Sequence, residues 1–325
     1  ANAGSVSGDL VVSGGTLEMN GQGLSVGGNA TLTGSLTTGA GTLSVTGTTE
    51  IDGTVTATGG ALDLNGNVLA ASTGTLTMND GSLNASGSVV NVSNLSGGPT
   101  WTTGTLTLDG SGGQTLSLSG ASLQNLTVNK GTNTDVVTVD TALTVGGTTT
   151  VTSGVLNHSE GATFSGPVSV AATNGTLRNT SANTKSYSFG STVAVEGVFQ
   201  FAANALVLSF TGGAGGEVSV GNSGSFLISG GNGADRVTLQ QDGASGGTRW
   251  TLSNAGTGTV TVTGARVQDG AAGFGPTASN SSDEGNNSGW VFAGKTTAWT
   301  DGAAGNSNWS DYDNWSNDKP PLGDT

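Results

Sequence analysis

The chain of 325 residues contains no cysteine, and only 9% of its residues are charged and 5% aromatic. Without cysteine, disulfide bonds cannot stabilise the fold, and a metal site built from Cys and His is excluded. So few bulky side chains also exclude the thick layered core of an ordinary globular domain. The chain has no uninterrupted apolar run of about 18 residues, so the sequence predicts no transmembrane helix.

Positive charge is equally scarce. The formal net charge is −14, and the eight basic residues lie far apart: Lys130, Arg178, Lys185, Arg236, Arg249, Arg266, Lys295 and Lys319. Because binding to a phosphate backbone needs clustered Lys and Arg, the sequence predicts no nucleic-acid partner and disfavours anionic membrane surfaces. An acidic surface of this kind promotes solubility and attracts divalent cations.

The chain is rich in glycine, with 59 residues, and it repeats a short pattern. Brief stretches in which Val, Leu, Ile or Ala alternate with Thr or Ser start every six or seven residues and end at Gly, Asn, Ser or Asp. The clearest stretches are 10–12, 16–19, 24–26, 30–32, 35–37, 42–45, 49–51, 54–56, 61–64, 68–70 and 75–78. Such alternation indicates strands with one buried and one solvated face, which a disordered Gly- and Ser-rich sequence does not require.

Three such strands make a unit of roughly 20 residues, a period typical of solenoids. The sequence therefore predicts an all-β fold, a right-handed parallel β-helix (β-solenoid) of three-strand rungs over residues 1–292. At about 20 residues a rung, this gives roughly fourteen rungs. With strands about 4.8 Å apart, the predicted length is on the order of 70 Å.

Larger side chains gather between residues 160 and 240: Phe164, Tyr187, Phe189, Phe199, Phe201, Phe210 and Phe226. A wider cross-section that needs larger core residues explains them, and an aromatic platform for a ligand is the alternative. Residues 293–325 break the repeat, with Trp299, Trp309 and Trp315 among Asp, Asn and Gly. This last stretch is predicted to be a linker or the start of a following module.

The repeat resembles that of bacterial β-helical surface proteins of the filamentous haemagglutinin and autotransporter-passenger type. Four Gly-Thr-Leu tripeptides carry the resemblance, at residues 15–17, 41–43, 74–76 and 104–106. Residues 112–130 resemble a sequence segment common in those large proteins, and residues 267–292 resemble the segment that ends such a β-helical module. The resemblance covers nearly the whole chain and concerns the style of the repeat. It implies a secreted, often very long surface protein.

Candidates for catalysis are few. His158 is the only histidine, so a Ser-His-Asp triad would have to use it. No nucleophile motif accompanies His158, and its position at a predicted strand end favours a corner. A glycosidase needs two carboxylates in one cleft, and Glu50 and Asp52 are predicted to face the same side of one strand. The other acidic residues are spread singly, so the sequence predicts no catalytic residue.

Two patterns suggest binding. Residues 230–238, which include Asp235, fit the calcium-binding nonapeptide of RTX repeats, but no second copy follows in the next turn. A plain corner is therefore predicted, and no metal or cofactor. Thr-x-Thr motifs such as Thr54-Val55-Thr56 would form an ice-binding surface only as flat ranks on successive rungs. The threonines are expected on all faces instead, because Thr suits outward-facing strand positions.

These observations predict an extracellular structural and adhesive protein without enzymatic activity, secreted or held on a bacterial cell surface. Terminal rungs are sheet edges that invite another chain, so copies are expected to join end to end into a fibre, stalk or filament. Cell-surface glycans or other surface proteins are further expected partners. The alternative is a carbohydrate-binding or polysaccharide-degrading β-helix that uses Trp101, Trp250, or Phe199 and Phe201 as a stacking surface.

Overall fold

The computed structural model describes residues 3–293, except 72, 80–81, 88, 93, 95–98, 119–121, 173, 182–183, 232 and 244–247. Parallel strands stack as a β-solenoid with three strands in each turn and turns about 21 residues apart. The predicted β-solenoid is therefore confirmed. The chain divides into two compact units: unit 1, Ala1–Leu177, and unit 2, Arg178–Thr325. Nearly all of the predicted linker or module at 293–325 lies outside the described residues.

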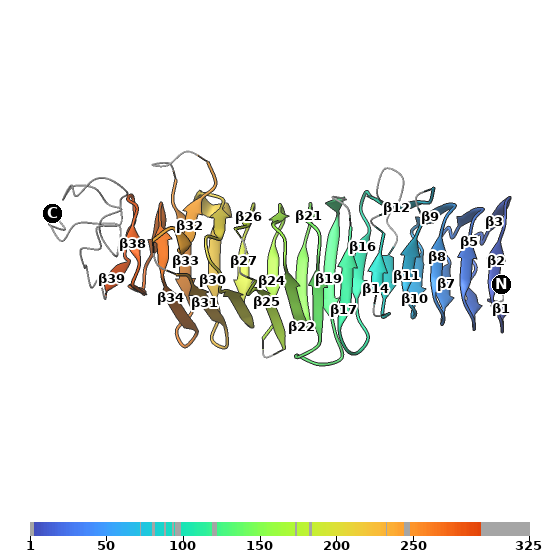
Figure 1. The fold of residues 1–325 in the computed structure, drawn as a ribbon, viewed down its shortest axis with the longest axis horizontal. Coiled ribbons are helices and arrows are strands. Elements are labelled where there is room, and N and C mark those ends of the chain that lie inside the picture. Colours follow the sequence, from blue (N-terminus) through green and yellow to red (C-terminus); the bar gives the residue numbers. More distant parts are fainter. Residues whose placement is uncertain are drawn as a thin grey trace, which may run out of the picture. The chain divides into compact units, whose positions relative to one another are not determined.

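Unit 1 has three faces, each a row of parallel strands from consecutive turns (Figure 1). Its first face contains β1 (Gly4–Val6), β4 (Leu24–Val26), β7 (Thr42–Val45), β10 (Ala61–Leu64), β13 (Ser82–Ala85), β16 (Thr105–Leu108), β19 (Asn125–Asn129), β22 (Thr149–His158) and β24 (Val168–Val170). Its second face contains β2 (Leu10–Val12), β5 (Ala30–Leu32), β8 (Thr49–Ile51), β11 (Val68–Ala70), β14 (Val89–Asn91), β17 (Gln114–Ser117), β20 (Val136–Val139) and the second half of β22. Its third face contains β3 (Thr16–Glu18), β6 (Ser35–Thr37), β9 (Thr54–Thr58), β12 (Thr75–Asn79) and β15 (Thr100–Trp101), followed by β18 (Ser122–Leu123), β21 (Leu143–Val145) and β23 (Ala162–Phe164).

The alternating sequence determines which side chains enter the core. In β7, Leu43 and Val45 are fully buried, whereas Thr42 and Ser44 point outward. Leu43 lies in register with Leu24 in the preceding turn and with Leu62 in the following one. Burial of such a Leu stabilises the fold by about 1.5–3 kcal/mol, so the thin core consists of aliphatic ladders that run from turn to turn.

Short polar side chains connect the corners of successive turns. The backbone N–H of Asn29 donates to Asp9 Oδ1 at 2.7 Å, and the Asn29 side-chain oxygen accepts from the Thr48 N–H at 2.8 Å. These partners are 20 and 19 residues apart, one turn each. Because corners leave backbone N–H groups outside the strand ladders, Asp and Asn at these positions satisfy donors that would otherwise lose a hydrogen bond.

Unit 2 repeats the three-face arrangement with longer turns, and β25 (Gly175–Asn179) contains the boundary between the units. Its first face contains β27 (Val193–Val195), β30 (Glu217–Val220), β33 (Trp250–Asn254) and β36 (Gly270–Ala272). Its second face contains β28 (Val198–Phe201), β31 (Ser225–Ser229), β34 (Thr259–Thr263), β37 (Thr277–Ser279) and β39 (Val291–Ala293). Its third face contains β26 (Ser186–Phe189), β29 (Val207–Phe210), β32 (Val237–Gln241), β35 (Ala265–Val267) and β38 (Ser282–Asp283), and two short 3₁₀ helices, η1 (Gly213–Gly215) and η2 (Gly233–Asp235), lie in connecting segments.

The number of turns is lower than predicted. The described residues form about 12 turns rather than fourteen. Turn length varies, because insertions at corners lengthen some turns: Ser253 donates to Glu217 one turn earlier, although the two residues are 36 apart. A uniform 20-residue period therefore overestimates the count.

Aromatic side chains fill the interior of unit 2. Phe199 stacks on Phe226 with ring centroids 5.2 Å apart, and Phe189 stacks on Phe210 at the same distance. All four rings are buried. The prediction that these aromatic residues belong to the core is confirmed, and the alternative of an exposed aromatic platform is wrong.

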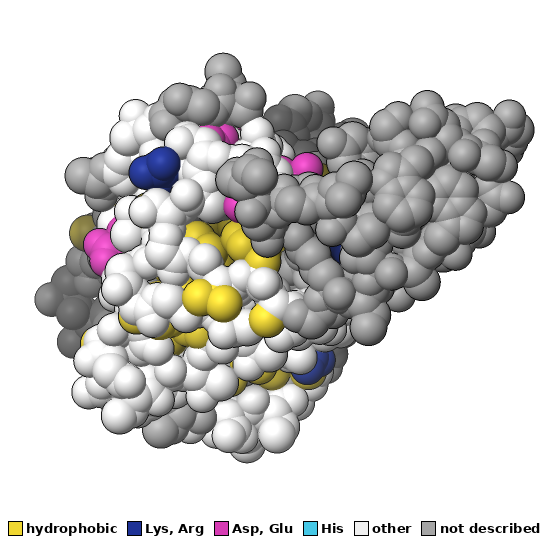
Figure 2. All heavy atoms as spheres, turned by 90° about the vertical axis from the view of Figure 1, so that its left-hand side faces the viewer, with side chains coloured by type: hydrophobic (Ala, Val, Ile, Leu, Met, Phe, Trp, Pro, Cys, Tyr) yellow, Lys and Arg dark blue, Asp and Glu magenta, His cyan; other side chains and the backbone are white. Residues whose placement is uncertain are grey.

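The end of unit 2 that carries β39 exposes apolar surface. Val291 in β39 is 49% exposed, and Phe274, between β36 and β37 in the preceding turn, is 39% exposed. Figure 2 shows hydrophobic side chains gathered in the middle of this end, beside polar and backbone atoms. Within the described part of the chain, no helix is long and apolar enough to span a membrane.

Candidate functional site

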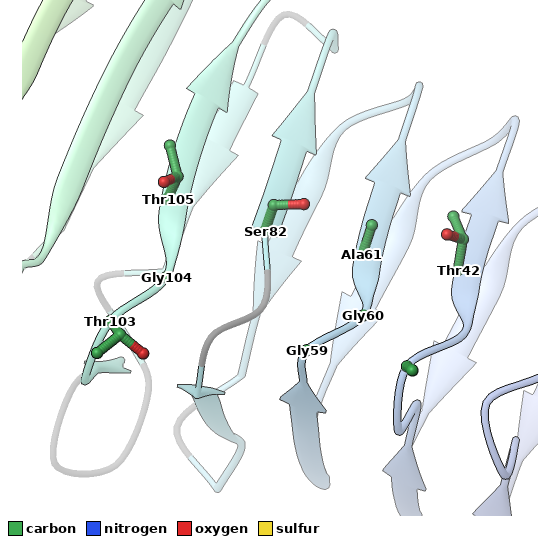
Figure 3. A pocket seen from close by; sticks show the side chains of 9 residues that line it. Thr42, Gly59, Gly60, Ala61, Ser82, Thr103, Gly104 and Thr105 are labelled. Atoms are coloured by element: carbon green, nitrogen blue, oxygen red, sulfur yellow. The ribbon is translucent and has the colours of Figure 1, made fainter.

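A shallow groove lies on unit 1 where the first face begins. Thr42, Ala61, Ser82 and Thr105 open strands β7, β10, β13 and β16 and lie in register across four turns (Figure 3). Together with the corner residues below them they enclose about 250 Å³. We call this site the hydroxyl groove, and its lining consists of Ala40, Thr42, Gly59, Gly60, Ala61, Ser82, Thr103, Gly104 and Thr105.

Glycine forms the floor of the groove because successive corners approach too closely for a side chain. A Cβ on Gly60 would lie 2.2 Å from the carbonyl oxygen of Gly41 and 2.5 Å from that of Gly39. Above this floor, the described lining offers hydroxyl groups and methyl groups but no charged side chain. Hydroxyls both donate and accept hydrogen bonds, so the groove suits an uncharged polar ligand and offers no acid or base for catalysis.

A second polar site is buried at the corner between the first and second faces of unit 1. Lys130 follows β19 and is only 3% exposed, as is Gln114 at the start of β17. Lys130 Nζ donates to the backbone oxygen of Asp109 and, at 3.4 Å, to Gln114 Oε1. We call Lys130, Gln114 and the neighbouring Asp109, Asp135 and Gly154 the Lys130 cluster.

Backbone groups from several turns hold the two side chains of the cluster in place. Gln114 Nε2 donates to the carbonyl oxygens of Ala85 at 2.9 Å and Gly87 at 2.7 Å. The Lys130 N–H donates to Ser153 O at 3.0 Å. Gly154 has φ +89°, and a Cβ there would lie 2.6 Å from Cβ and Cγ of Lys130. Only glycine leaves room for the lysine stem beneath this corner.

Burial sets the electrostatics of the cluster. Desolvation lowers the pKa of Lys130 below its usual value, while the charges of Asp135 and Asp109 oppose that shift. Desolvation raises the pKa of Asp109, the charge of Asp63 adds to the shift, and Lys130 opposes it. Both shifts favour neutral forms, an unprotonated amine and a protonated carboxyl.

His158 lies in the core instead of at a solvated corner. It is the last residue of β22, fully buried, and meets the edge of Phe164 at a centroid distance of 5.7 Å. Burial lowers the pKa of His158 to about 3. The corner predicted from sequence is wrong, because the strand continues through His158 with its side chain pointing inward.

The two acidic residues singled out by sequence do not lie on the same strand. Strand β8 ends at Ile51. Glu50 is therefore an exposed strand residue, whereas Asp52 lies in the bend directly after the strand. There the Asp52 carboxylate accepts a hydrogen bond from the Thr73 hydroxyl of the next turn. The expectation that both acids lie on one strand is therefore wrong, and Asp52 serves as a corner acceptor.

Asp235 ends the 3₁₀ helix η2 and is exposed, and its backbone oxygen accepts from the Gly231 and Ala205 N–H groups. No group of three or more His, Asp or Glu side chains among the residues that the structure describes could hold a metal ion. Neighbouring Arg236 is buried. This segment thus forms a hydrogen-bonded corner.

Threonines are brought into register on the third face of unit 1. Thr37, Thr56, Thr77 and Thr100 lie in successive turns, and Thr54 and Thr75 form a parallel rank with Ser35. The first face carries a similar rank of Thr107, Thr127 and Thr150. Threonine ranks therefore occur on more than one face, as outward-facing strand residues.

The aromatic residues proposed as a stacking surface are inaccessible. Trp250 and Phe199 are fully buried, and Trp101 is 7% exposed. Sequence reasoning missed the hydroxyl groove and the Lys130 cluster. The sequence held one signal for the cluster. Lys130 is the first basic residue in the chain, because residues 1–129 contain no Lys or Arg.

Comparison with known proteins identifies no relative. No protein-family model, no curated protein and no solved structure matches this chain.

Proposed function

We propose that this chain is an extracellular structural and adhesive repeat protein whose copies join end to end into a fibre, stalk or filament at a bacterial cell surface. The β-solenoid fold is consistent with adhesins and surface-repeat proteins. The observation that carries the proposal is the one-sided pairing of the strands in the first described turn of unit 1.

Strands β1, β2 and β3 form the edge at that turn, and their pairing partners among the described residues are β4, β5 and β6. In β2, the Leu10 N–H donates to Asn29 O and the Val12 oxygen accepts from Thr33. Because backbone direction alternates along a parallel strand, the N–H and C=O of Val11 point away from β5. Such an edge is a template for another strand.

The core is also incompletely covered at this turn. Val6, Leu10 and Leu17 are half-buried, whereas their partners one turn further on, Val26, Ala30 and Leu36, are at most 2% exposed. A further turn stacked on the edge would bury these side chains. Parallel strands pair in one direction, so the β39 end of unit 2 of a second copy, with exposed Phe274 and Val291, is the occupant we propose. Such a head-to-tail contact does not close and builds filaments.

Sedimentation velocity and electron microscopy of Val11→Pro test this contact. Proline removes the outward-pointing N–H and leaves the bonds of Leu10 and Val12 to unit 1 intact. We expect the unmodified chain to associate with rising concentration and Val11→Pro to remain monomeric. Val11→Thr is the matched control, because it keeps the N–H, and it should associate normally. A monomeric unmodified chain, or unchanged association of Val11→Pro, would refute the proposal.

The hydroxyl groove favours glycan binding as a second function, because its described lining is polar and uncharged. Ala61→Phe would fill the groove, while Thr107→Phe places the same ring on the same face outside it. A glycan array should show binding that Ala61→Phe abolishes and Thr107→Phe retains. Binding that survives in Ala61→Phe would locate the glycan site elsewhere.

A further inference from the structure

The Lys130 cluster places the amine of Lys130 beside the side-chain amide of Gln114, in a unit that has no disulfide bond. Lys130 Nζ lies 3.4 Å from the side-chain oxygen of Gln114, and both side chains are 3% exposed. We propose that these two residues react to form an intramolecular isopeptide bond, a covalent staple between corners of successive turns. The inference does not depend on the proposed function.

The geometry holds the reacting groups against each other. The two hydrogen bonds from Gln114 Nε2 to Ala85 O and Gly87 O fix the amide so that its oxygen faces Lys130. The lysine stem is confined beneath Gly154, where no space is left for a side chain. Holding two groups in contact in this way removes most of the entropic cost of their reaction.

The reaction requires no added reagent. The neutral Lys130 amine attacks Cδ of Gln114, and a C–N bond forms as the carbonyl electron pair moves to oxygen. Collapse of this intermediate breaks the original C–N bond, a proton moves from the lysine nitrogen to the departing nitrogen, and one ammonia leaves. The product contains a secondary amide between the two side chains.

The surroundings supply the acid and base that such a transfer needs. Burial favours the neutral amine by lowering the pKa of Lys130, and it makes the carboxylate of Asp109 a stronger proton acceptor by raising its pKa. The carboxyl of Asp109 interacts electrostatically with the amine. As a carboxylate it can take the proton from the attacking nitrogen, and as the acid so formed it can give that proton to the leaving nitrogen. Asp135 is the second carboxylate whose charge acts on the amine.

Mass spectrometry and trypsin test the bond directly on the full chain. The intact mass should be lower than the sequence mass by one ammonia. Residues 1–129 and 131–177 contain no Lys or Arg, so trypsin acting on the denatured protein should leave residues 1–178 as one peptide. An unreacted Lys130 would allow cleavage into 1–130 and 131–178. The sequence mass with full cleavage after Lys130 would overturn the proposal.

A cyclised Asn-Gly pair such as Asn65-Gly66 would also remove one ammonia, but would permit cleavage after Lys130. Ammonia loss with cleavage would therefore also overturn the proposal. Gln114→Met should restore both the sequence mass and cleavage after Lys130, whereas Lys185→Arg, at a remote lysine, should retain the bond. The unmodified chain decides the question even if Gln114→Met does not fold.

Discussion

At the residue scale, the buried His158 makes unit 1 sensitive to acid. Its pKa is about 3 in the folded chain and about 6.5 when unfolded. Between these two pKa values, His158 binds a proton in the unfolded chain but not in the folded chain. The contribution of this group to the free energy of unfolding is fully present above about pH 6.5 and falls by about 1.4 kcal/mol per pH unit until about pH 3.

His158→Leu should remove this part of the acid sensitivity. Urea unfolding at pH 7 and at about pH 4.5 measures it, because the carboxylates contribute equally to both proteins. We expect the unmodified chain to lose about 2–3 kcal/mol more than His158→Leu between these two pH values. Equal losses would show that His158 is protonated inside the fold.

Glycines at the corners differ in how much space a side chain would find. At Gly60 a Cβ would lie 2.2 Å from a backbone oxygen of the preceding turn, whereas at Gly8 it would meet nothing within 4 Å. Gly60→Ala should lower the free energy of unfolding by about 1–3 kcal/mol. Gly8→Ala should leave it unchanged or raise it by up to about 1 kcal/mol, because Ala reduces the freedom of the unfolded chain. Thermal unfolding of both variants checks the difference, and equal effects would refute the steric argument.

At the scale of the elements, the sequence predicts strands well because each strand follows a simple alternation. The stretches predicted at 24–26, 30–32 and 42–45 coincide with β4, β5 and β7. The buried Leu and outward Thr of these strands need no information from elsewhere in the chain. The same alternation also gives the period of the solenoid.

The polar sites could not be predicted in this way, because they join residues from corners of varying length. Gln114 bonds to Ala85 and Gly87, 29 and 27 residues earlier, and to Lys130, 16 residues later. None of these three spacings matches the repeat of about 21 residues. His158 was misplaced for a related reason, since β22 passes from the first face to the second without the break that usually separates strands.

The aromatic stacks of unit 2 predict a large effect of truncation. Phe199 is fully buried between Phe226 and Phe189, so Phe199→Ala should lower the free energy of unfolding by about 3–5 kcal/mol through cavity formation. Gln200→Ala changes the outward-facing neighbour on the same strand and should stay within about 0.5 kcal/mol. Urea unfolding followed by Trp fluorescence compares the two. A small effect of Phe199→Ala would contradict the core role of the stack.

At the scale of the whole molecule, a solenoid cannot cover its own ends. Each turn buries its apolar residues only against the turns before and after it, which is why Val6 and Leu10 in the first turn stay half-buried while Val26 and Ala30 are covered. Adding a turn gains both backbone hydrogen bonds and core contacts. The backbone hydrogen bonds and core contacts that stack turns within one chain can therefore also join two chains.

The net charge of −14 opposes such joining. Two acidic copies repel each other over a distance set by the Debye length, which falls from about 30 Å at 0.01 M salt to about 3 Å at 1 M. The proposed end-to-end association should therefore strengthen as NaCl is raised between these limits, and sedimentation velocity measures the change. Because high salt also promotes unspecific aggregation, Val11→Pro provides the control. It should remain monomeric at about 1 M NaCl if the contact is made by strand pairing at the edge, whereas aggregation of both proteins would mean that salt acts on apolar surface in general.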